Sequence, residues 1–314
     1  MPEVMKAIHT YARGGPERLI CEDAPMPTLN SRDALVRVHA TGITTAELTW
    51  DETYQNADGS DRLPSIPGHE LAGVITALAP DVTGVQVGDA VYGLCDFARD
   101  GAAAEYVAVR ATNLAPKPRT LGYEQTAAVP LSALTAWQAL FRHGGLSENM
   151  RVLIHGAAGG VGTFAVQFAR WRGAQIAVTA SLRDAEFLRG LGADQVIDYT
   201  ANRFDEKLHS IDLVLDTVGG ETQERSWKVL RPGGVLIALT APVPAAKAEQ
   251  FGARGVFFIV EPSRDDLLEI TRLIDSGKLK PIVAEVFPLA RAREAFERGV
   301  HGHTRGKIVL KVRD

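Results

Sequence analysis

The stretch Arg151-Val-Leu-Ile-His-Gly-Ala-Ala-Gly-Gly-Val-Gly162 decides the fold of the second half of this chain. Its apolar start, Val152–Ile154, is typical of a buried parallel strand, and the glycines that follow predict a tight turn. Beyond the turn, apolar residues recur at helical spacing as far as Ala169, which predicts a helix with one apolar face. Strand, glycine turn and helix therefore come in the order that a dinucleotide-binding unit requires.

The start of this helix suits a pyrophosphate group, because its backbone N–H groups are unpaired and carry partial positive charge. Gly159 and Gly162 fill the second and third glycine places of the dinucleotide fingerprint, while Ala157 occupies the first. An ordinary glycine-rich turn is the alternative. The residues expected to contact a cofactor here are Ala158, Gly159, Gly160, Val161 and Gly162.

The end of the next predicted strand, residues 175–179, favours NADPH over NADH. In an NAD-binding unit, an acidic residue about 20 residues beyond the glycines accepts hydrogen bonds from the ribose 2′-hydroxyl. This strand end has no carboxylate. Asp184 fits better as the N3 residue of a capping box whose N-cap is Ser181. Arg183 then lies in a first helical turn, where the helix dipole disfavours a cation. A 2′-phosphate bound by Arg183 and Ser181 explains that position. A solvated arginine is the alternative.

The bulk properties are those of a globular protein. The chain has 314 residues, of which 46% are hydrophobic and 23% charged, and this length favours two domains. A net charge of −4 argues against a nucleic-acid partner. We see no signal peptide, and no apolar run approaches the roughly 18 residues that cross a bilayer. Cys21 and Cys95 form neither a disulfide framework nor a CxxC metal pair. We therefore expect a cytoplasmic protein without a membrane partner.

The pattern of predicted secondary structure changes near residue 120. Before it, the chain predicts strands and turns, with strands at 34–40, 71–77 and 89–93. After it, apolar strands alternate with helices, which is typical of a doubly wound parallel sheet. The predicted strands of this part are 151–155, 175–179, 195–198, 211–216, 234–239 and 255–260. The tail predicts a helix at 264–276, a strand at 282–287, a helix at 290–299 and a last strand at 306–312.

Several motifs occur in a characteristic order along the chain. They are Gly68-His-Glu-Leu-Ala-Gly73, Val87-Gly-Asp-Ala-Val-Tyr-Gly93, Ala104-Glu-Tyr-Val107, the loop Ala157–Gly162, Leu191-Gly-Ala-Asp194, Asp216-Thr-Val-Gly219 and Arg305-Gly-Lys-Ile-Val-Leu310. With these motifs the chain resembles the zinc-independent branch of the medium-chain dehydrogenase/reductase family, particularly the quinone oxidoreductase-like enzymes.

The resemblance implies an α/β protein of two domains. One is a GroES-like, β-rich catalytic domain formed by residues 1–122 with 261–314. The other is a Rossmann domain at 123–260, a doubly wound parallel sheet that binds NADP. The family commonly dimerises by pairing the last Rossmann strand, here around Gly255–Val260, edge to edge, so we expect a homodimer.

The resemblance also implies cofactor contacts outside the glycine loop. They are Thr135 near the nicotinamide, Tyr199 near the adenosine phosphate, Val218 beside the adenine ribose, and Phe258 and Val260 with backbone groups toward the carboxamide. Arg305 and Lys307, next to the last strand, are expected either to approach the phosphates or to be solvated surface cations.

We expect no metal. Zinc-dependent relatives hold a catalytic zinc with a cysteine, a histidine and a third cysteine or acid. The first place falls at Thr44, His69 keeps the second, and the third should lie near 130–133, which offers no good ligand. A single imidazole cannot hold zinc, whose sites need three or four protein ligands. His69 is therefore expected to be a hydrogen-bonded turn histidine rather than a catalytic one.

Without a Lewis acid, an alkoxide loses its main stabilising partner, whereas a quinone or enone delocalises the negative charge itself. We therefore expect an NADPH-dependent oxidoreductase that reduces a quinone or an α,β-unsaturated carbonyl. The quinone reductases of the family usually have an asparagine and a tyrosine where this sequence has Thr44 and Thr49. These two threonines and Tyr54 are the catalytic candidates, with loop packing as the alternative for Thr49 and Tyr54. The polar stretch 54–61 is expected to be a mobile loop over the active site.

Two other functions remain open. One is a dehydrogenase that acts on an alcohol or aldehyde, which the missing zinc ligands disfavour. The other is a sensor or binding protein that keeps NADPH without turnover, because the sequence contains no catalytic triad and no unequivocal catalytic acid.

Overall fold

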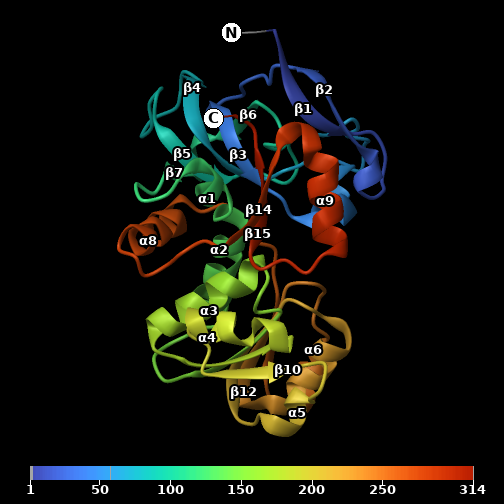
Figure 1. Cartoon of the computed structure of the whole chain (residues 1–314), viewed down its shortest axis with the longest axis vertical. Coiled ribbons are helices and arrows are strands. Elements are labelled where there is room, and N and C mark those ends of the chain that lie inside the picture. Colours follow the sequence, from blue (N-terminus) through green and yellow to red (C-terminus); the bar gives the residue numbers. More distant parts are fainter. Residues whose placement is uncertain (1–2, 57, 314) are drawn as a thin grey trace. The chain divides into compact units, whose positions relative to one another are not determined.

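The computed structural model describes residues 3–56 and 58–313. These residues form two compact units. Unit 1 comprises the described residues up to Leu131, then Pro262–Gly277, and those from Pro281 onward; unit 2 comprises Ser132–Glu261 and Lys278–Lys280. The blue and red ends of the chain in Figure 1 thus belong to the same unit. The expected α/β class is confirmed.

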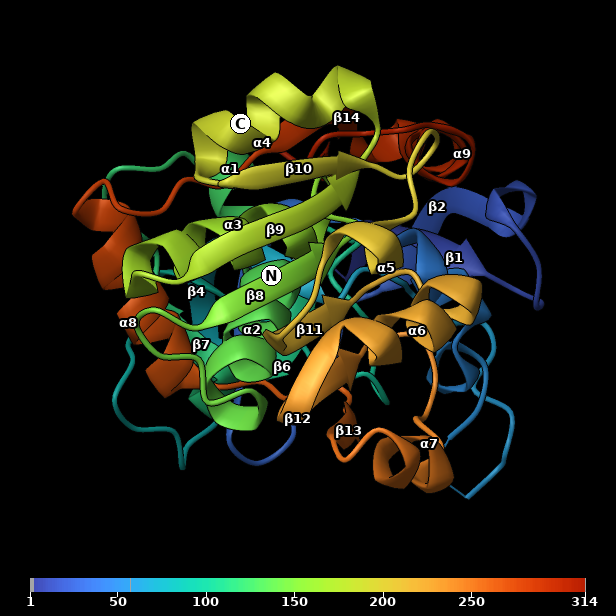
Figure 2. The same cartoon turned by 90° about the horizontal axis from the view of Figure 1, so that it is seen from below.

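Unit 2 contains a sheet of six parallel strands in the order β10-β9-β8-β11-β12-β13 (Figure 2). The strands are β8 Arg151–His155, β9 Gln175–Ala180, β10 Gln195–Asp198, β11 Ile211–Asp216, β12 Leu230–Ala238 and β13 Arg254–Phe257. The strand order reverses direction between β8 and β11, and ligands of such sheets bind beyond the carboxyl ends of the strands at that point. The glycine loop follows β8, so it lies at this position.

The helices of unit 2 cover its sheet. They are α3 Gly160–Arg172, α4 Ala185–Leu191, α5 Phe204–Lys207, α6 Gly220–Ser226 and α7 Ala245–Gln250, and α2 Pro130–Trp137 leads into the unit. We predicted that α3 buries one apolar face, but the helix is buried on all sides from Gly162 to Ala169. The polar Gln167 is satisfied inside, because its Nε2 donates to the carbonyls of Thr163 at 2.9 Å and Lys280 at 3.0 Å.

Two predicted strands of unit 2 have different bounds in the structure. Strand β12 begins at Leu230, four residues before the predicted start. The prediction missed these first four residues because they are not buried and show no alternation of apolar residues. Strand β13 ends at Phe257, so Phe258 and Val260 follow the strand instead of ending it.

Unit 1 is built mainly from strands. They are β1 Val4–Thr10, β2 Leu19–Pro25, β3 Asp33–Gly42, β4 Glu70–Leu78, β5 Ala90–Leu94, β6 Tyr106–Arg110, β7 Leu114–Pro116, β14 Val283–Pro288 and β15 Lys307–Lys311. Strands β1 and β2 pair with each other, and the rest form one sheet in the order β14-β15-β3-β4-β5-β7, with β6 also on β3. The last strand runs antiparallel to the end of β3, with Val309 opposite Gly42. This pairing brings the start of β15 to the residues that follow β3.

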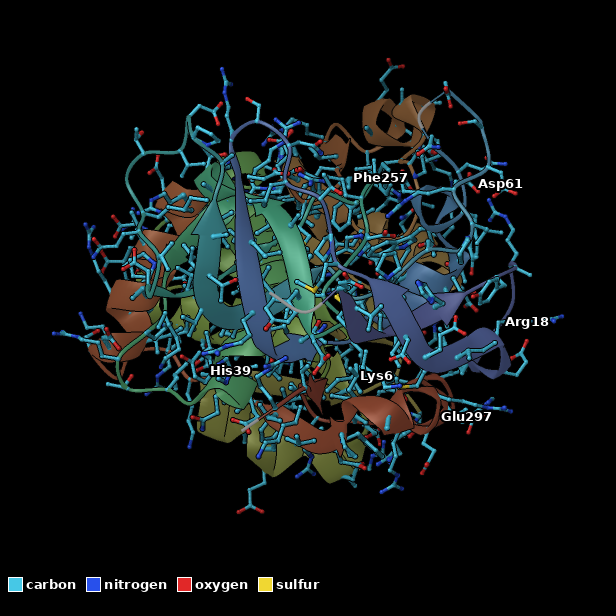
Figure 3. All side chains as sticks on the ribbon, turned by 90° about the horizontal axis from the view of Figure 1, so that it is seen from above. Lys6, Arg18, His39, Asp61, Phe257 and Glu297 are labelled. Atoms are coloured by element: carbon cyan, nitrogen blue, oxygen red, sulfur yellow. The ribbon has the colours of Figure 1, made fainter. Side chains whose placement is uncertain are left out.

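Three helices complete unit 1: α1 Tyr123–Ala127, α8 Arg264–Asp275 and α9 Ala292–His301. Helix α1 packs on β3 and β4, so unit 1 extends beyond the domain boundary predicted at residue 122. His39 of β3, labelled in Figure 3, stacks on Tyr123 of α1 with ring centroids 4.1 Å apart. Helix α9 buries Phe296 in a core shared with β1 and β15. No helix within the described residues is long and apolar enough to span a bilayer.

A buried histidine ends strand β8, directly before the glycine loop. His155 Nδ1 lies 2.8 Å from Thr179 Oγ1, and Nε2 lies 3.0 Å from Ser226 Oγ. The Ser226 hydroxyl donates to the carbonyl of Thr222 at 2.7 Å, so it accepts from His155, and the imidazole proton belongs on Nε2. Burial, aided by the nearby Arg225 charge, lowers the pKa of His155 to about 3.

This histidine predicts acid sensitivity of the fold. His155 stays neutral in the folded protein but takes up a proton in the unfolded chain below its ordinary pKa of 6.5, so stability is lost as the pH falls from there toward 3. We expect His155 to lower the free energy of unfolding by up to about 1.4 kcal/mol per pH unit in that window. Urea denaturation of the wild type and of His155→Asn between pH 7.5 and 4.5 measures the difference. Parallel pH dependences of the two proteins would contradict the assignment.

Candidate functional site

The loop between β8 and α3 is closely packed around one glycine. Gly156 has a φ of +66°, and its carbonyl accepts from the N–H of Gly159 at 3.1 Å. A Cβ on Gly162 would lie 2.4 Å from Gly156 O and 2.5 Å from Ala157 Cα, whereas a Cβ on Gly159 would meet nothing closer than 3.4 Å. Gly162 therefore allows the helix to start against the strand. Gly159 keeps the outer side of the loop open.

The outer side of the loop presents backbone to a ligand. Ala158, Gly159, Gly160 and Val161 are half-buried, while Gly162 is buried. Helix α3 runs for 13 residues from Gly160, so its first N–H groups carry the partial positive charge of a long helix. A pyrophosphate fits this combination of open backbone and unpaired N–H groups.

The end of β9 differs from the predicted capping box. Ser181 precedes a single 3-10 turn, Leu182–Asp184, and its side chain caps no backbone N–H. Its hydroxyl instead donates to Asp184 Oδ2 at 2.9 Å, and the N–H of Asp184 donates to the backbone carbonyl of Ser181 at 3.0 Å. Arg183 Nε lies 3.7 Å from the same carboxylate oxygen, and the arginine side chain is 55% exposed. The structure thus brings Ser181 and Arg183 together around Asp184.

Large apolar side chains are exposed beyond the carboxyl ends of three strands of the unit 2 sheet. Leu182 follows β9 and is 72% exposed, Tyr199 follows β10 and is 53% exposed, and Val218 follows β11 and is 53% exposed. Asp216 holds Val218 in place, since its Oδ1 accepts from the N–H groups of Val218 and Gly219 at 2.9 Å each. Apolar groups exposed together mark ligand-binding surfaces. Leu182 was not among the predicted cofactor contacts, although it directly follows Ser181 in the sequence.

The remaining cofactor candidates lie on α2 and after β13. Thr135 of α2 and Val260 are buried, and Phe258 packs on the His143 ring with centroids 4.4 Å apart. Gln138 joins the two segments, because its Nε2 donates to the carbonyl of Glu261 at 2.8 Å and its Oε1 accepts from the N–H of Glu261 at 3.1 Å. The segment that carries Phe258 and Val260 is therefore fixed to the end of α2.

In unit 1, three polar side chains meet where β15 reaches the end of β3. Lys307 Nζ lies 2.5 Å from Glu70 Oε2 and donates to Thr44 Oγ1 at 2.9 Å. Glu70 Oε1 accepts from the N–H of Leu131 at 3.0 Å. The expectation of a solvated cation at Lys307 was wrong, because its side chain is buried in this ion pair, and the alternative of a phosphate contact stays a prediction. Burial raises the pKa of Glu70, and the Lys307 charge opposes that effect.

His69 forms a second buried pair, with Glu47. Its Nδ1 contacts Glu47 Oε1, which also accepts from the N–H of Gly68 at 2.7 Å, and its Nε2 lies 3.3 Å from the carbonyl of Arg99. Both ring nitrogens thus face protein oxygens, as expected of a hydrogen-bonded histidine. We had not predicted Glu47, which reaches His69 from the 3-10 turn Thr45–Thr49.

The donor set around His69 does not fit a catalytic zinc. Thr44 offers a hydroxyl that already accepts from Lys307, and the one imidazole is engaged by Glu47. Among residues 3–56 and 58–313, no three His, Cys, Asp or Glu side chains are grouped so that they could hold a metal ion. Zinc sites need three or four such ligands.

The other two catalytic candidates make local contacts. Thr49 Oγ1 donates to the carbonyl of Ala46 at 2.7 Å, and its side chain is exposed. Tyr54 is 3% exposed, donates its hydroxyl to the carbonyl of Leu48 at 2.7 Å and lies under the Arg13 guanidinium. The contacts of Tyr54 fit the alternative of loop packing. Neither side chain has a hydrogen bond to Thr44 among the described contacts.

The polar stretch after Tyr54 folds back on itself. Asn56 N–H donates to the carbonyl of Ser60 at 2.9 Å, and Gln55 forms a bridge with Asp61. Asp61, labelled in Figure 3, is exposed. Ala57 of this stretch lies outside the described residues. The expected motion of the loop stays a prediction.

Known proteins resemble the chain over nearly its whole length. The model of the alcohol dehydrogenase GroES-like domain matches residues 30–119, and a zinc-binding dehydrogenase model matches residues 191–310. A probable zinc-binding mitochondrial oxidoreductase of Arthroderma benhamiae is 34% identical over 92% of this chain and 91% of its own. The chain belongs to the quinone oxidoreductase-like medium-chain dehydrogenase/reductases.

Other members of this family are similar in sequence and structure. A chloroplastic NADPH-dependent alkenal/one oxidoreductase of Arabidopsis thaliana is 32% identical over 99% of this chain and 80% of its own. The solved quinone oxidoreductase of Coxiella burnetii is 31% identical, with a TM-score of 0.92 over 99% of this chain and 100% of that one. The expected family and its GroES-like and Rossmann architecture are thereby confirmed.

The packing of the glycine loop predicts unequal effects of two alanine substitutions. Gly162→Ala should lower the free energy of unfolding by about 1–3 kcal/mol, because the added methyl group collides with the backbone of the preceding turn. Gly159→Ala is the matched control and should change it little, since its Cβ has room and its φ is −76°. Chemical denaturation of both variants without cofactor measures the difference. Equal stabilities would show that Gly162 is not sterically required.

Proposed function

We propose that this family member is an NADPH-dependent oxidoreductase that delivers hydride to a quinone or an α,β-unsaturated carbonyl without catalytic zinc. The observation that carries the proposal is the set of side chains at the expected zinc positions, where Thr44 offers a hydroxyl bonded to a buried ammonium and His69 is paired with Glu47. Such groups donate hydrogen bonds to a carbonyl oxygen but do not replace the Lewis acid that an alkoxide requires. An acceptor that delocalises its own negative charge suits this chemistry.

The cofactor proposal rests on unit 2. When bound, NADPH supplies the hydride. The open backbone of Ala158–Val161 suits its pyrophosphate, and the exposed apolar side chains of Leu182, Tyr199 and Val218 suit its adenosine. Arg183 and Ser181 suit a 2′-phosphate, since the arginine side chain is more than half exposed and both residues contact the same oxygen of Asp184. Thr135, Phe258 and Val260 are proposed for the nicotinamide end by the resemblance.

In unit 1, Thr44 is the proposed substrate contact. It is half-buried, and its hydroxyl oxygen already accepts a hydrogen bond from Lys307. Thr49 and Tyr54 are weaker proposals, because each hydroxyl donates to a backbone carbonyl of its own loop. Relatives named as a quinone oxidoreductase and as an alkenal/one oxidoreductase support both acceptor classes.

The homodimer and the cytoplasmic location also stay proposals. Strand β13 is the outer strand of its sheet among the described residues, and Phe257 and Ile259 beside it are exposed, which suits edge-to-edge pairing. The names of two relatives place them in mitochondria and in chloroplasts, so the location needs its own measurement.

The proposed reaction predicts oxidation of NADPH by electron-poor acceptors. We expect turnover with a panel of quinones and enones, little turnover with simple aldehydes, and no loss of activity after dialysis against a chelator. Absorbance at the NADPH band follows the reaction, and metal analysis of the same sample is the control. Loss of activity with the metal would overturn zinc independence. NADPH binding without turnover on any acceptor would favour a binding protein or sensor.

Arg183 predicts the choice between the two nicotinamide cofactors. Arg183→Ala should raise the KM for NADPH by about 10- to 100-fold through the lost charged hydrogen bonds, and should change the KM for NADH little. Arg189→Ala, which removes an exposed cation from α4 of the same unit, is the matched control and should behave like the wild type. An equal effect of Arg183→Ala on both cofactors would remove Arg183 from the phosphate site.

A further inference from the structure

The contact between Lys307 and Thr44 has a fixed direction. A lysine ammonium has three N–H donors and no acceptor, so Thr44 Oγ1 must be the acceptor in the 2.9 Å hydrogen bond. The threonine hydroxyl still has its own proton to donate. Within residues 3–56 and 58–313, its oxygen makes no other side-chain hydrogen bond. That proton is therefore directed away from Lys307, and Thr44 is only half-buried, so a ligand can reach it.

The ammonium is held in place from its other side. Glu70 Oε2 lies 2.5 Å from Lys307 Nζ, and Glu70 Oε1 is occupied by the N–H of Leu131. A Cβ on Gly42 would lie 2.6 Å from Glu70 Oε2, so the carboxylate fits only because residue 42 is a glycine. Lys307 and Glu70 are both buried, and the pair is thus fixed before any ligand arrives.

We propose that Lys307 is a positioning residue that makes the Thr44 hydroxyl a dedicated hydrogen-bond donor to the carbonyl oxygen of the acceptor. This inference rests on the proposed function. A free threonine hydroxyl can rotate and act either as donor or as acceptor. With Lys307 donating to one of its two lone pairs, the hydroxyl proton is kept away from the ammonium, and the hydroxyl is preorganised to donate to an oxygen on which negative charge develops.

The step balances without any further reagent. Hydride from NADPH adds to the conjugated carbon of the acceptor, and the π electrons move onto the carbonyl oxygen. The acceptor is thereby reduced by two electrons to an enolate, and NADPH, when bound, would be the reductant that supplies both electrons with the hydride; for a quinone, tautomerisation then gives the hydroquinone form. The Thr44 hydroxyl donates a hydrogen bond to that oxygen without losing its proton. A proton from water then completes the saturated carbonyl compound or the hydroquinone.

A double-mutant cycle on the full chain tests the inference. Thr44→Val removes the hydroxyl, and we expect kcat to fall by about 100-fold, the lower range for loss of one oxyanion donor. The paired variant Lys307→Met with Glu70→Gln removes both buried charges together, and we expect kcat to fall about 10-fold with a smaller change in the KM for the acceptor. In the Thr44→Val background the paired variant should cost nothing further, because Lys307 acts through Thr44.

The controls separate positioning from folding. Thr44→Ser keeps the hydroxyl and should retain most of kcat. The control variant Lys311→Met with Glu124→Gln removes a half-exposed ion pair at the other end of β15, in which Lys311 Nζ lies 3.7 Å from Glu124 Oε1. This variant should leave kcat unchanged. Thermal unfolding and the Kd for NADPH are measured for every variant. If the paired variant does not fold, Lys307→Gln takes its place, because an amide can donate or accept and no longer fixes the threonine.

The outcomes distinguish this inference from the proposed function. Losses that multiply across the cycle would overturn it, since they mean that Lys307 acts independently of Thr44. Wild-type kcat in the paired variant would overturn it as well, while the proposed reaction stands. A wild type that oxidises NADPH with no quinone or enone would remove the proposed function and this inference together.

Discussion

The buried pair of Lys307 and Glu70 is the interaction on which the order of unit 1 depends. Two opposite charges in a protein interior are costly to desolvate and stabilise each other only when both are well placed. Here the placement requires that the last strand pair with the end of β3, that Gly42 leave room for the carboxylate, and that Leu131 satisfy its second oxygen. Four distant parts of the sequence, at Gly42, Glu70, Leu131 and Lys307, thus meet in one small polar cluster. Removing either charge alone would leave the other buried without a partner.

Unit 2 is organised by a steric constraint instead. Its inner strands β8, β9 and β11 are almost entirely buried, so they need little besides apolar residues. The place where backbone must approach backbone is the start of α3, and Gly162 provides it. Two buried polar groups of this unit, His155 and Gln167, are satisfied by hydroxyls and carbonyls. Unit 2 buries carboxylates as well: Asp216 accepts from the N–H groups of Val218 and Gly219, and the Asp205 carboxylate pairs with Arg225.

Much of the fold could be predicted from the sequence, because its signals are local. We predicted nearly all strands of unit 2 from the apolar runs and the glycine turn. The family motifs predicted the GroES-like and Rossmann architectures of the two domains. The bounds of β12 and β13 were missed, since the exposed start of β12 lacks an apolar pattern. In the candidate site, Thr44 and the loop backbone were found by motif, but Glu47 and the buried state of Lys307 were not. Their partners, His69 and Glu70, lie far away in sequence, and only tertiary packing pairs them.

The discontinuity of unit 1 has a consequence for biosynthesis. Ala40, Thr41 and Gly42 pair with Val309, Leu310 and Lys311 of β15, which are synthesised much later than β3. Until the ribosome has made β15, the end of β3 keeps unpaired backbone groups, and Glu70 lacks Lys307 as its counterion. Such an open edge is a site of wrong strand pairing while the chain is nascent. Unit 2 depends on later sequence only through Lys278–Lys280, so most of it can fold before β15 is made.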